Sequence, residues 1–348
     1  MSNWAIEELK YADLGDRRRK ERLIKIVSDL AAQPNASVPQ ASGDWAGTQG
    51  AYDFWSNKRV KAEDIRLAHQ KSTIERVKQH ETIVAIQDTS ELNFTNHSSK
   101  KGMGHLDNKN SRGVKMHSVF CVSPLGVPLG VLHQKVWARE LSNIGKKHTR
   151  KKREIKDKES KRWLEGLSIT QEVIPADVKV VTVADCEADI YDFLAMPRPA
   201  NSELLIRAYQ NRCVKTDISV EKLQVAIDSS ERVGEITLEL QRTPERKARQ
   251  VTLSLRTMSV ELQPPKAHIN YSYLKPIRVA VIKAEEENPP VGEKPVTWLL
   301  LTTIKINDFN GIVQCLRWYS YRWLIERYHY TLKSGCRLEQ LQLKSADR

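Results

Sequence analysis

The sequence predicts an α/β protein in which a small helical amino-terminal domain precedes a mixed sheet with an all-β insertion. Residues 5–32 and 44–79 carry apolar side chains at helical spacing, on either side of a segment rich in proline, serine and asparagine. From about residue 80, short β-branched runs alternate with helical segments. Between 213 and 306 the sequence shows short β-prone runs and turn residues, and a final helix follows.

These patterns place one domain boundary near residue 79. We expect a helical domain over residues 1–79 and a sheet domain over 80–348, with the β insertion at about 213–306. A turn around Leu125 predicts a hairpin. The expected strands are 82–88, 116–123, 127–137, 178–185 and 203–209 in the sheet, and 235–240, 251–256, 268–274, 277–284 and 297–303 in the insertion; the expected helices are 159–173, 187–196 and 319–335.

Composition favours a polyanionic partner in a reducing compartment. Fifty-six Lys and Arg against 43 Asp and Glu give a formal charge of +13, which points first to nucleic acid and second to an anionic membrane surface. No apolar run approaches the roughly 18 residues of a membrane span, and the amino terminus lacks the apolar core of a signal peptide. Five scattered cysteines without a C-x-x-C pair argue against disulfides and zinc. We therefore expect a cytoplasmic protein.

Positive charge is concentrated in one segment. Residues 141–162 hold ten basic and three acidic side chains, with the densest run at 146–162. Such a run is either a solvated loop or an arm that contacts phosphates.

The final predicted helix, 319–335, carries four polar groups among tryptophans and leucines. At about 100° per residue, Tyr319, Arg322, Glu326 and Lys333 fall on one arc roughly 60° wide. A phenol, a guanidinium and an ammonium suit a phosphodiester backbone, but a glutamate repels phosphate unless a divalent cation is bound. The alternative is an ordinary solvent-facing side, because Arg322 and Glu326 form an i,i+4 pair.

Two aspartates each follow a predicted strand. Asp88 ends the first strand and Asp185 the fourth. Carboxylates at neighbouring strand ends repel one another without a cation between them, and Mg²⁺ takes such ligands. With Glu326 as a third acid, two metal ions can activate a water and stabilise a leaving 3′ oxygen at phosphorus. Asp88 alone also fits a turn or a helix cap, because Asp-Thr-Ser-Glu is good capping chemistry.

The motifs around these acids resemble those of bacterial cut-and-paste transposases of the Asp-Asp-Glu class, specifically the insertion-sequence-four family of transposon-five type. The spacing Y-x2-R-x3-E-x6-K from Tyr319 to Lys333 matches the family's Y-R-E-K signature. IQDTSELNF and DCEADIYDFL resemble the segments around its two aspartates. LGDRRRKERL at 14–23 is similar to its end-recognition helix, and PVTWLLLT at 295–302 to its strand with a DNA-contacting tryptophan.

The resemblance implies a ribonuclease-H-like catalytic core and an amino-terminal domain that binds the transposon end. It implies that Asp88, Asp185 and Glu326 bind Mg²⁺, for which Mn²⁺ can substitute. The implied DNA contacts are Tyr319, Arg322 and Lys333 to phosphates, Trp298 to a flipped base, Arg18, Arg19 and Arg22 to the terminal DNA, and Trp323 in the signature segment. The alternatives are a buried strand tryptophan for Trp298 and an exposed basic helix face for the three arginines. Asp189 is interpreted as a supporting or surface residue.

The implied activity is that of a DNA transposase acting on its terminal repeats and on target DNA, with a hairpin intermediate and final strand transfer. The implied location is the bacterial nucleoid, and no membrane partner is expected. Family members continue past the signature helix into a region that pairs two protomers. This sequence ends 15 residues after Lys333, so we expect that dimerisation region to be absent and a homodimer on DNA to require it. Two other functions stay open: a truncated, non-catalysing DNA-binding remnant or inhibitor, and a stand-alone nuclease.

Overall fold

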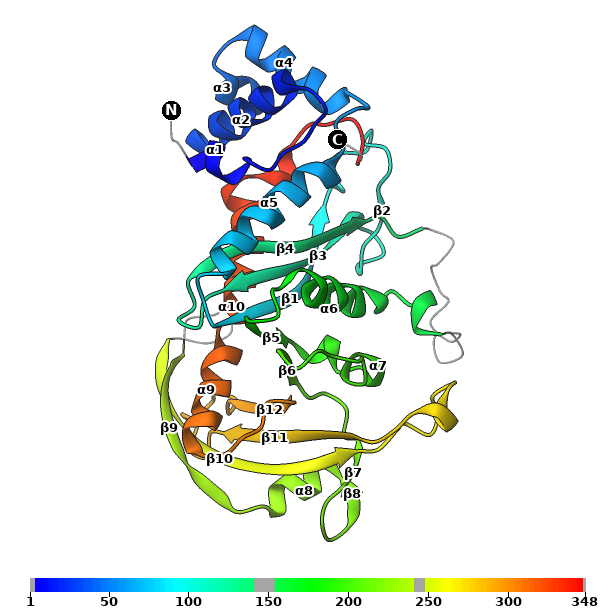
Figure 1. The fold of residues 1–348 in the computed structure, drawn as a ribbon, viewed down its shortest axis with the longest axis vertical. Helices are drawn as coiled ribbons and strands as arrows, with labels where there is room; N and C mark the ends of the chain where they lie inside the picture. Colours follow the sequence, from blue (N-terminus) through cyan, green and yellow to red (C-terminus); the bar gives the residue numbers. More distant parts are fainter. Residues whose placement is uncertain (1–3, 141–153, 241–247, 347–348) are drawn as a thin grey trace. The chain divides into compact units, whose positions relative to one another are not determined.

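The chain forms two compact units in the computed structural model (Figure 1). The described residues are 4–140, 154–240 and 248–346. The first unit comprises residues up to 146, 168–178 and 323–348, and the second comprises 147–167 and 179–322. The basic segment lies outside the described residues up to residue 153, so its role stays a prediction. None of the helices within the described ranges is long and apolar enough to cross a membrane.

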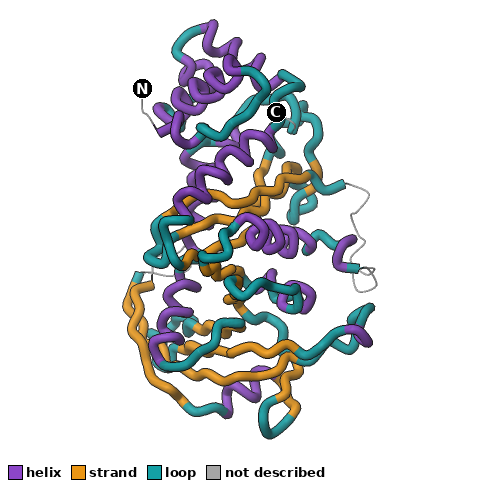
Figure 2. Tube along the Cα trace, in the orientation of Figure 1, coloured by secondary structure: helices purple, strands orange, loops and turns teal. Residues whose placement is uncertain are grey.

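The amino-terminal part of the first unit is helical, as predicted (Figure 2). Its helices are α1 (Trp4–Glu8), α2 (Arg17–Ala32), α3 (Val38–Ser42), α4 (Trp45–Ser56) and α5 (Ala62–Val77). The single helix predicted over 5–32 is wrong, because Gly15 adopts a φ of +67° and Asp16 then caps α2 by accepting from the Arg18 backbone N–H. Asp44 caps α4 in the same way through the Gly47 N–H. Leu23, Phe54 and other apolar side chains form a core that also includes Ala68 of α5.

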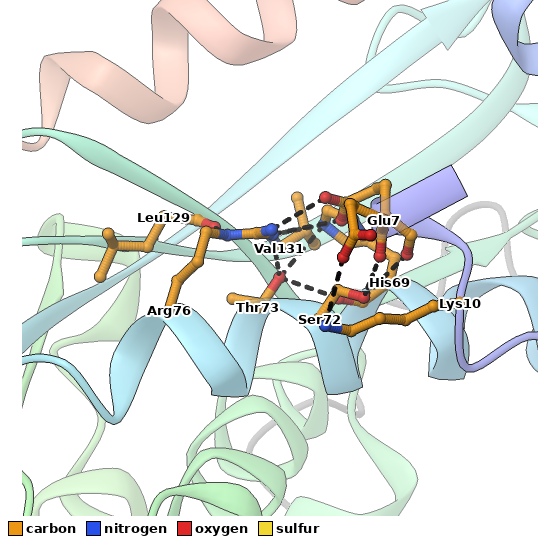
Figure 3. Close-up of polar contacts among 9 residues, drawn as sticks. Glu7, Lys10, His69, Ser72, Thr73, Arg76, Leu129 and Val131 are labelled. Carbon is orange, nitrogen blue, oxygen red and sulfur yellow. Dashed lines mark hydrogen bonds and ion pairs between the residues drawn. The ribbon is translucent and has the colours of Figure 1, made fainter. Parts of the chain in front are cut away.

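A partly buried ion pair fixes α1 against α5 and the sheet (Figure 3). Glu8 accepts hydrogen bonds from the Arg76 guanidinium at 2.8 and 3.2 Å and from His69 Nδ1. His69 Nε2 accepts from the Val131 N–H at 2.8 Å, so the ring carries its proton on Nδ1. Burial alone would raise the pKa of Glu8, but the hydrogen bonds from His69 and Arg76 and the positive charge of Arg76 outweigh it and hold the pKa at about 2.

The first unit also contains an antiparallel sheet (Figure 1). Its strands are β1 (Thr82–Asn93), β2 (Gly104–His105), β3 (Arg112–Val122) and β4 (Pro128–Trp137). β3 pairs with β1, β2 and β4. The change from helix to strand falls between Val77 and Thr82, close to the predicted position. The predicted end of the first strand at Asp88 is wrong, because pairing with β3 continues through five further residues to Asn93.

The second unit contains a mixed sheet. β5 (Lys179–Ala184) and β6 (Ser202–Arg207) are parallel, and β12 (Thr297–Thr302), β11 (Ile277–Glu285) and β10 (Arg249–Leu262) continue the sheet from β6 in antiparallel pairs. The sheet ends in β7 (Cys213–Lys215) and β8 (Val220–Lys222), and β9 (Arg232–Leu240) also pairs with β10. The predicted α/β class with a mixed sheet and amino-terminal helices is confirmed.

Helices and turns of the second unit differ from the predictions in three places. The expected helix at 187–196 is reduced to a 3₁₀ turn, Cys186–Ala188, and α7 (Tyr191–Leu194). The β insertion contains α8 (Leu223–Ser229), which was not predicted from the sequence. Its Leu223, Ala226 and Ile227 side chains are buried in the core. The predicted strand 268–274 is instead a loop with a 3₁₀ turn at Tyr271–Tyr273. The helix predicted at 159–173 is present as α6 (Lys161–Val173), of which residues 161–167 belong to this unit and 168–173 to the first.

Candidate functional site

The predicted helix 319–335 is divided into three segments. α9 (Phe309–Ser320) ends in a tight turn, in which the N–H groups of Tyr321 and Arg322 bond to carbonyls three residues back. α10 (Trp323–Tyr330) follows and passes into a π-helical turn, Thr331–Gly335. Because these turns change the residues per turn, the single arc predicted for the four signature residues is wrong.

The four signature residues consequently have different environments. Tyr319 lies in α9 and is only 4% exposed, and its ring packs edge-on against Trp298 at 5.5 Å. Arg322 lies in the turn and Lys333 in the π-helical turn. Glu326 is exposed in the first turn of α10. Contact of these four side chains with DNA stays a prediction. Tyr319 is in addition part of the buried core.

In the first unit, a row of polar side chains crosses the sheet beneath α10. Asp88 of β1 lies opposite Ser118 of β3, which lies opposite Gln134 of β4. Directly paired residues share a face of the sheet, so these three side chains project to the same side. α10 packs against β1 on this side, and the Gln134 amide donates to the Tyr328 hydroxyl at 3.0 Å. Tyr328 also stacks on the Phe120 ring.

Asp88 is in contact with α10 through His329. The His329 Nδ1 lies 3.8 Å from an Asp88 carboxylate oxygen, and its Nε2 lies 3.3 Å from the Ser118 hydroxyl. Asp88 also accepts from the Thr89 N–H at 2.8 Å, and its side chain is 17% exposed. Burial lowers the pKa of His329 to about 4, so the ring is neutral at pH 7 and does not compensate the Asp88 charge. Glu326 precedes His329 by three residues, so both lie on one side of α10.

Asp185 belongs to the second unit. It follows β5 and accepts from the Glu187 N–H at 2.9 Å, so it caps the 3₁₀ turn Cys186–Ala188. Ala184 pairs with Ile206 in the parallel register, which places Asp185 and Arg207 at the same edge of this sheet. Arg207 donates to the Thr297 carbonyl at 3.2 Å. Burial raises the pKa of Tyr319, and the positive charges of Arg322 and Arg207 oppose that rise.

Asp189 has a structural role. Its side chain is fully buried and forms two hydrogen bonds with Arg212, at 2.6 and 3.1 Å. It also accepts from the N–H groups of Tyr209 and Gln210. The interpretation as a surface residue is therefore wrong, because Asp189 holds the loop after β6 in place. The other interpretation from the sequence, that Asp189 is a supporting residue, agrees with these contacts.

The predicted DNA-contacting arginines of α2 divide into two kinds. Arg18 and Arg22 are exposed, and the Arg22 guanidinium lies against Gly50 of α4. Arg19 is half-buried and donates to the Leu14 carbonyl at 2.6 Å, so it helps to fold the turn before α2. Trp298 is half-buried between strand and helix, whereas Trp323 is 44% exposed.

The donor chemistry of these acids fits a hard cation. Asp88 and Glu326 supply carboxylate oxygens, and Mg²⁺ is usually bound by one or two carboxylates with water and substrate phosphate. Within the ranges that the structure describes, no group of three or more His, Cys, Asp or Glu side chains is gathered tightly enough to hold a metal ion. A site made by all three acids therefore stays a prediction.

Residues 1–60 match the family model described as transposase DNA-binding. This range covers α1 to α4, including the exposed Arg18 and Arg22. The match supports a transposase that binds DNA, and it confirms DNA as the partner expected from the sequence.

Three residues of these sites were not predicted from the sequence. His329 contacts Asp88, and Ser118 lies within hydrogen-bond distance of His329. Arg207 lies at the same edge of its sheet as Asp185. His329 had one signal, its position three residues after Glu326. Arg207 had another, since it lies near the end of the predicted strand 203–209, which follows the strand ending at Asp185. Ser118 had none, because its role depends on strand register.

Proposed function

We propose that this chain is a metal-dependent DNA transposase of the insertion-sequence-four family, with a ribonuclease-H-like catalytic core. The observation that carries the proposal is the transposase DNA-binding match at residues 1–60, which joins a DNA-binding module to a chain with the Asp88, Asp185 and Glu326 motifs. The contact of Asp88 with the helix that bears Glu326 supports it further.

In this proposal Asp88, Asp185 and Glu326 would hold divalent cations, Mg²⁺ or Mn²⁺, and the chemistry supplied there would be activation of water and stabilisation of the leaving oxygen. Water attacks a phosphodiester at the transposon end and releases a 3′-hydroxyl. That hydroxyl attacks the opposite strand, displaces the 3′ oxygen of the flanking DNA and forms a hairpin. A second water opens the hairpin, and the 3′-hydroxyl then attacks target DNA.

The protein side chains would position the nucleic acid. Arg18 and Arg22 are available for phosphates because both are exposed. Arg322, Lys333 and Trp323 would contact the DNA near Glu326. Trp298 would stack on an unpaired base. Its ring packs edge-on against Tyr319, so it would either leave Tyr319 or stack on the base through its free face. A homodimer on DNA and a nucleoid location are further parts of the proposal.

The test is cleavage of DNA that carries the element's own terminal repeats, in Mg²⁺. We expect Asp88→Asn, Asp185→Asn and Glu326→Gln each to abolish nicking while gel-shift binding persists. Glu187→Gln is the matched control for Asp185, because Glu187 is an exposed acid two residues away that pairs with Arg162. Cleavage that survives Glu326→Gln would refute the site. Binding without any cleavage by the unaltered protein would favour a non-catalysing DNA-binding remnant, and cleavage without preference for the repeats a stand-alone nuclease.

A further inference from the structure

His329 is the side chain through which α10 reaches the β1–β3 pair. It is 5% exposed, and its two ring nitrogens face two different strands. The Nε2 atom lies within hydrogen-bond distance of the Ser118 hydroxyl on β3, at 3.3 Å. The Nδ1 atom lies 3.8 Å from Asp88 on β1, which is too long for a hydrogen bond and places the ring in packing contact with the carboxylate.

The register of the sheet makes this arrangement specific. Asp88 and Ser118 are directly paired across β1 and β3, so one ring spans a single cross-strand pair. Ser118 thus fixes where the imidazole sits, and the imidazole limits where the Asp88 carboxylate can turn. The second carboxylate oxygen of Asp88 is held by the Thr89 N–H, which constrains the group from its other side.

The helix carries the same constraint to Glu326. Residues three apart on a helix have Cβ atoms about 5–6 Å from each other on one side of the helix. Fixing His329 against Asp88 therefore restrains the rotation of α10 about its axis and, with it, the position of the Glu326 backbone relative to Asp88. Tyr328, which bonds to Gln134 and stacks on Phe120, anchors the same turn through other partners.

We propose that His329 is a positioning residue that sets the separation of the Asp88 and Glu326 carboxylates for a shared divalent cation. This inference rests on the proposed function and adds to it a residue outside the acid set. Its side chain would not bind the cation. Its effect is geometric, since a ring held by Ser118 prevents α10 from rotating and Asp88 from turning away.

The experiment measures Mn²⁺ binding to the full chain on terminal-repeat DNA by electron paramagnetic resonance, which does not depend on catalysis. His329→Gln places an amide near the position of Nε2 and should keep the bond to Ser118. His329→Asn is too short to reach Ser118. We expect the Mn²⁺ dissociation constant to rise at least fivefold in His329→Asn and to stay within twofold of the unaltered protein in His329→Gln.

Tyr328→Phe is the matched control, because it removes the hydrogen bond with Gln134 from the same helical turn and keeps the ring on Phe120. Melting temperatures in EDTA report how much each variant loosens the fold without metal. We expect Tyr328→Phe to lower the melting temperature and to leave the Mn²⁺ dissociation constant within twofold. An equal rise in Tyr328→Phe and His329→Asn would overturn the inference, since the effect would then be general loosening of α10.

Asp88→Asn separates this inference from the proposed function. If Asp88→Asn binds Mn²⁺ as the unaltered protein does, the metal assignment of Asp88 fails, and the proposed function with it. If Asp88→Asn loses binding while His329→Asn keeps it unchanged, the proposed function stands and the inference about His329 is overturned.

Discussion

Replacing Glu8 by glutamine should loosen α1 from the rest of the first unit. The pKa of Glu8 falls from 4.5 to about 2 on folding, which corresponds to roughly 3 kcal/mol at about 1.36 kcal/mol per pKa unit. The Glu8 side chain is 21% exposed, so solvent screening reduces this stabilisation to roughly 2 kcal/mol. Glutamine keeps the shape and removes the charge that Arg76 and His69 contact.

The dependence on pH has a defined sign. Because folding lowers the pKa of Glu8, its stabilisation is complete above about pH 4.5 and is lost as the pH falls toward 2. The difference in stability between the unaltered protein and Glu8→Gln should therefore be largest at pH 7 and should shrink between pH 5 and pH 3.

Hydrogen exchange followed by mass spectrometry measures this opening locally, which suits a chain of two compact units. A loss of about 2 kcal/mol should lower the protection of the amides in the turn that follows α1, such as Leu9 and Ala12, roughly 30-fold at pH 7. Glu7→Gln is the matched control, because Glu7 is 64% exposed and forms a 3.5 Å surface pair with Lys10. Equal protection in Glu8→Gln and Glu7→Gln at pH 7 would refute the reasoning.

Three further predictions follow from single contacts. Arg18→Gln and Arg22→Gln should each weaken DNA binding and lower the slope of log affinity against log salt by about one, as measured by fluorescence anisotropy across a salt series. Gly130→Ala should lower the melting temperature through a loss of about 1–3 kcal/mol, because φ is +142° and a Cβ would lie 2.2 Å from an α5 hydroxyl; an unchanged melting temperature would contradict this. Asp189→Asn should cost about 3–5 kcal/mol by leaving the Arg212 charge buried and unpaired, which urea unfolding of the second unit would report.

The sequence allowed the helix-to-strand change near residue 80 and most strands to be predicted, because apolar periodicity is a local property. The extension of β1 past Asp88 was missed because its last residues are largely polar, and pairing with β3 alone keeps them in a strand. α8 was missed because its seven residues are short for a periodic signal.

The candidate site likewise combines local motifs, which can be read from the sequence, with contacts between residues far apart in the chain, which cannot. The three acids were predicted from their motifs and stay a prediction, whereas the break after Ser320 has no glycine or proline to indicate it. The role of His329 depends on Ser118, which is 211 residues away in the chain. The partners of Asp189 likewise lie in a later loop, so its burial could not be read from its neighbours.

The Glu8 cluster has a practical consequence for anyone who isolates the DNA-binding module. A fragment cut at residue 60 would contain Glu8 but neither His69 nor Arg76, and it would expose the apolar surface that Ala68 covers. Such a fragment would probe a damaged module, and a cut beyond Val77 would keep Glu8 with its cationic partner Arg76.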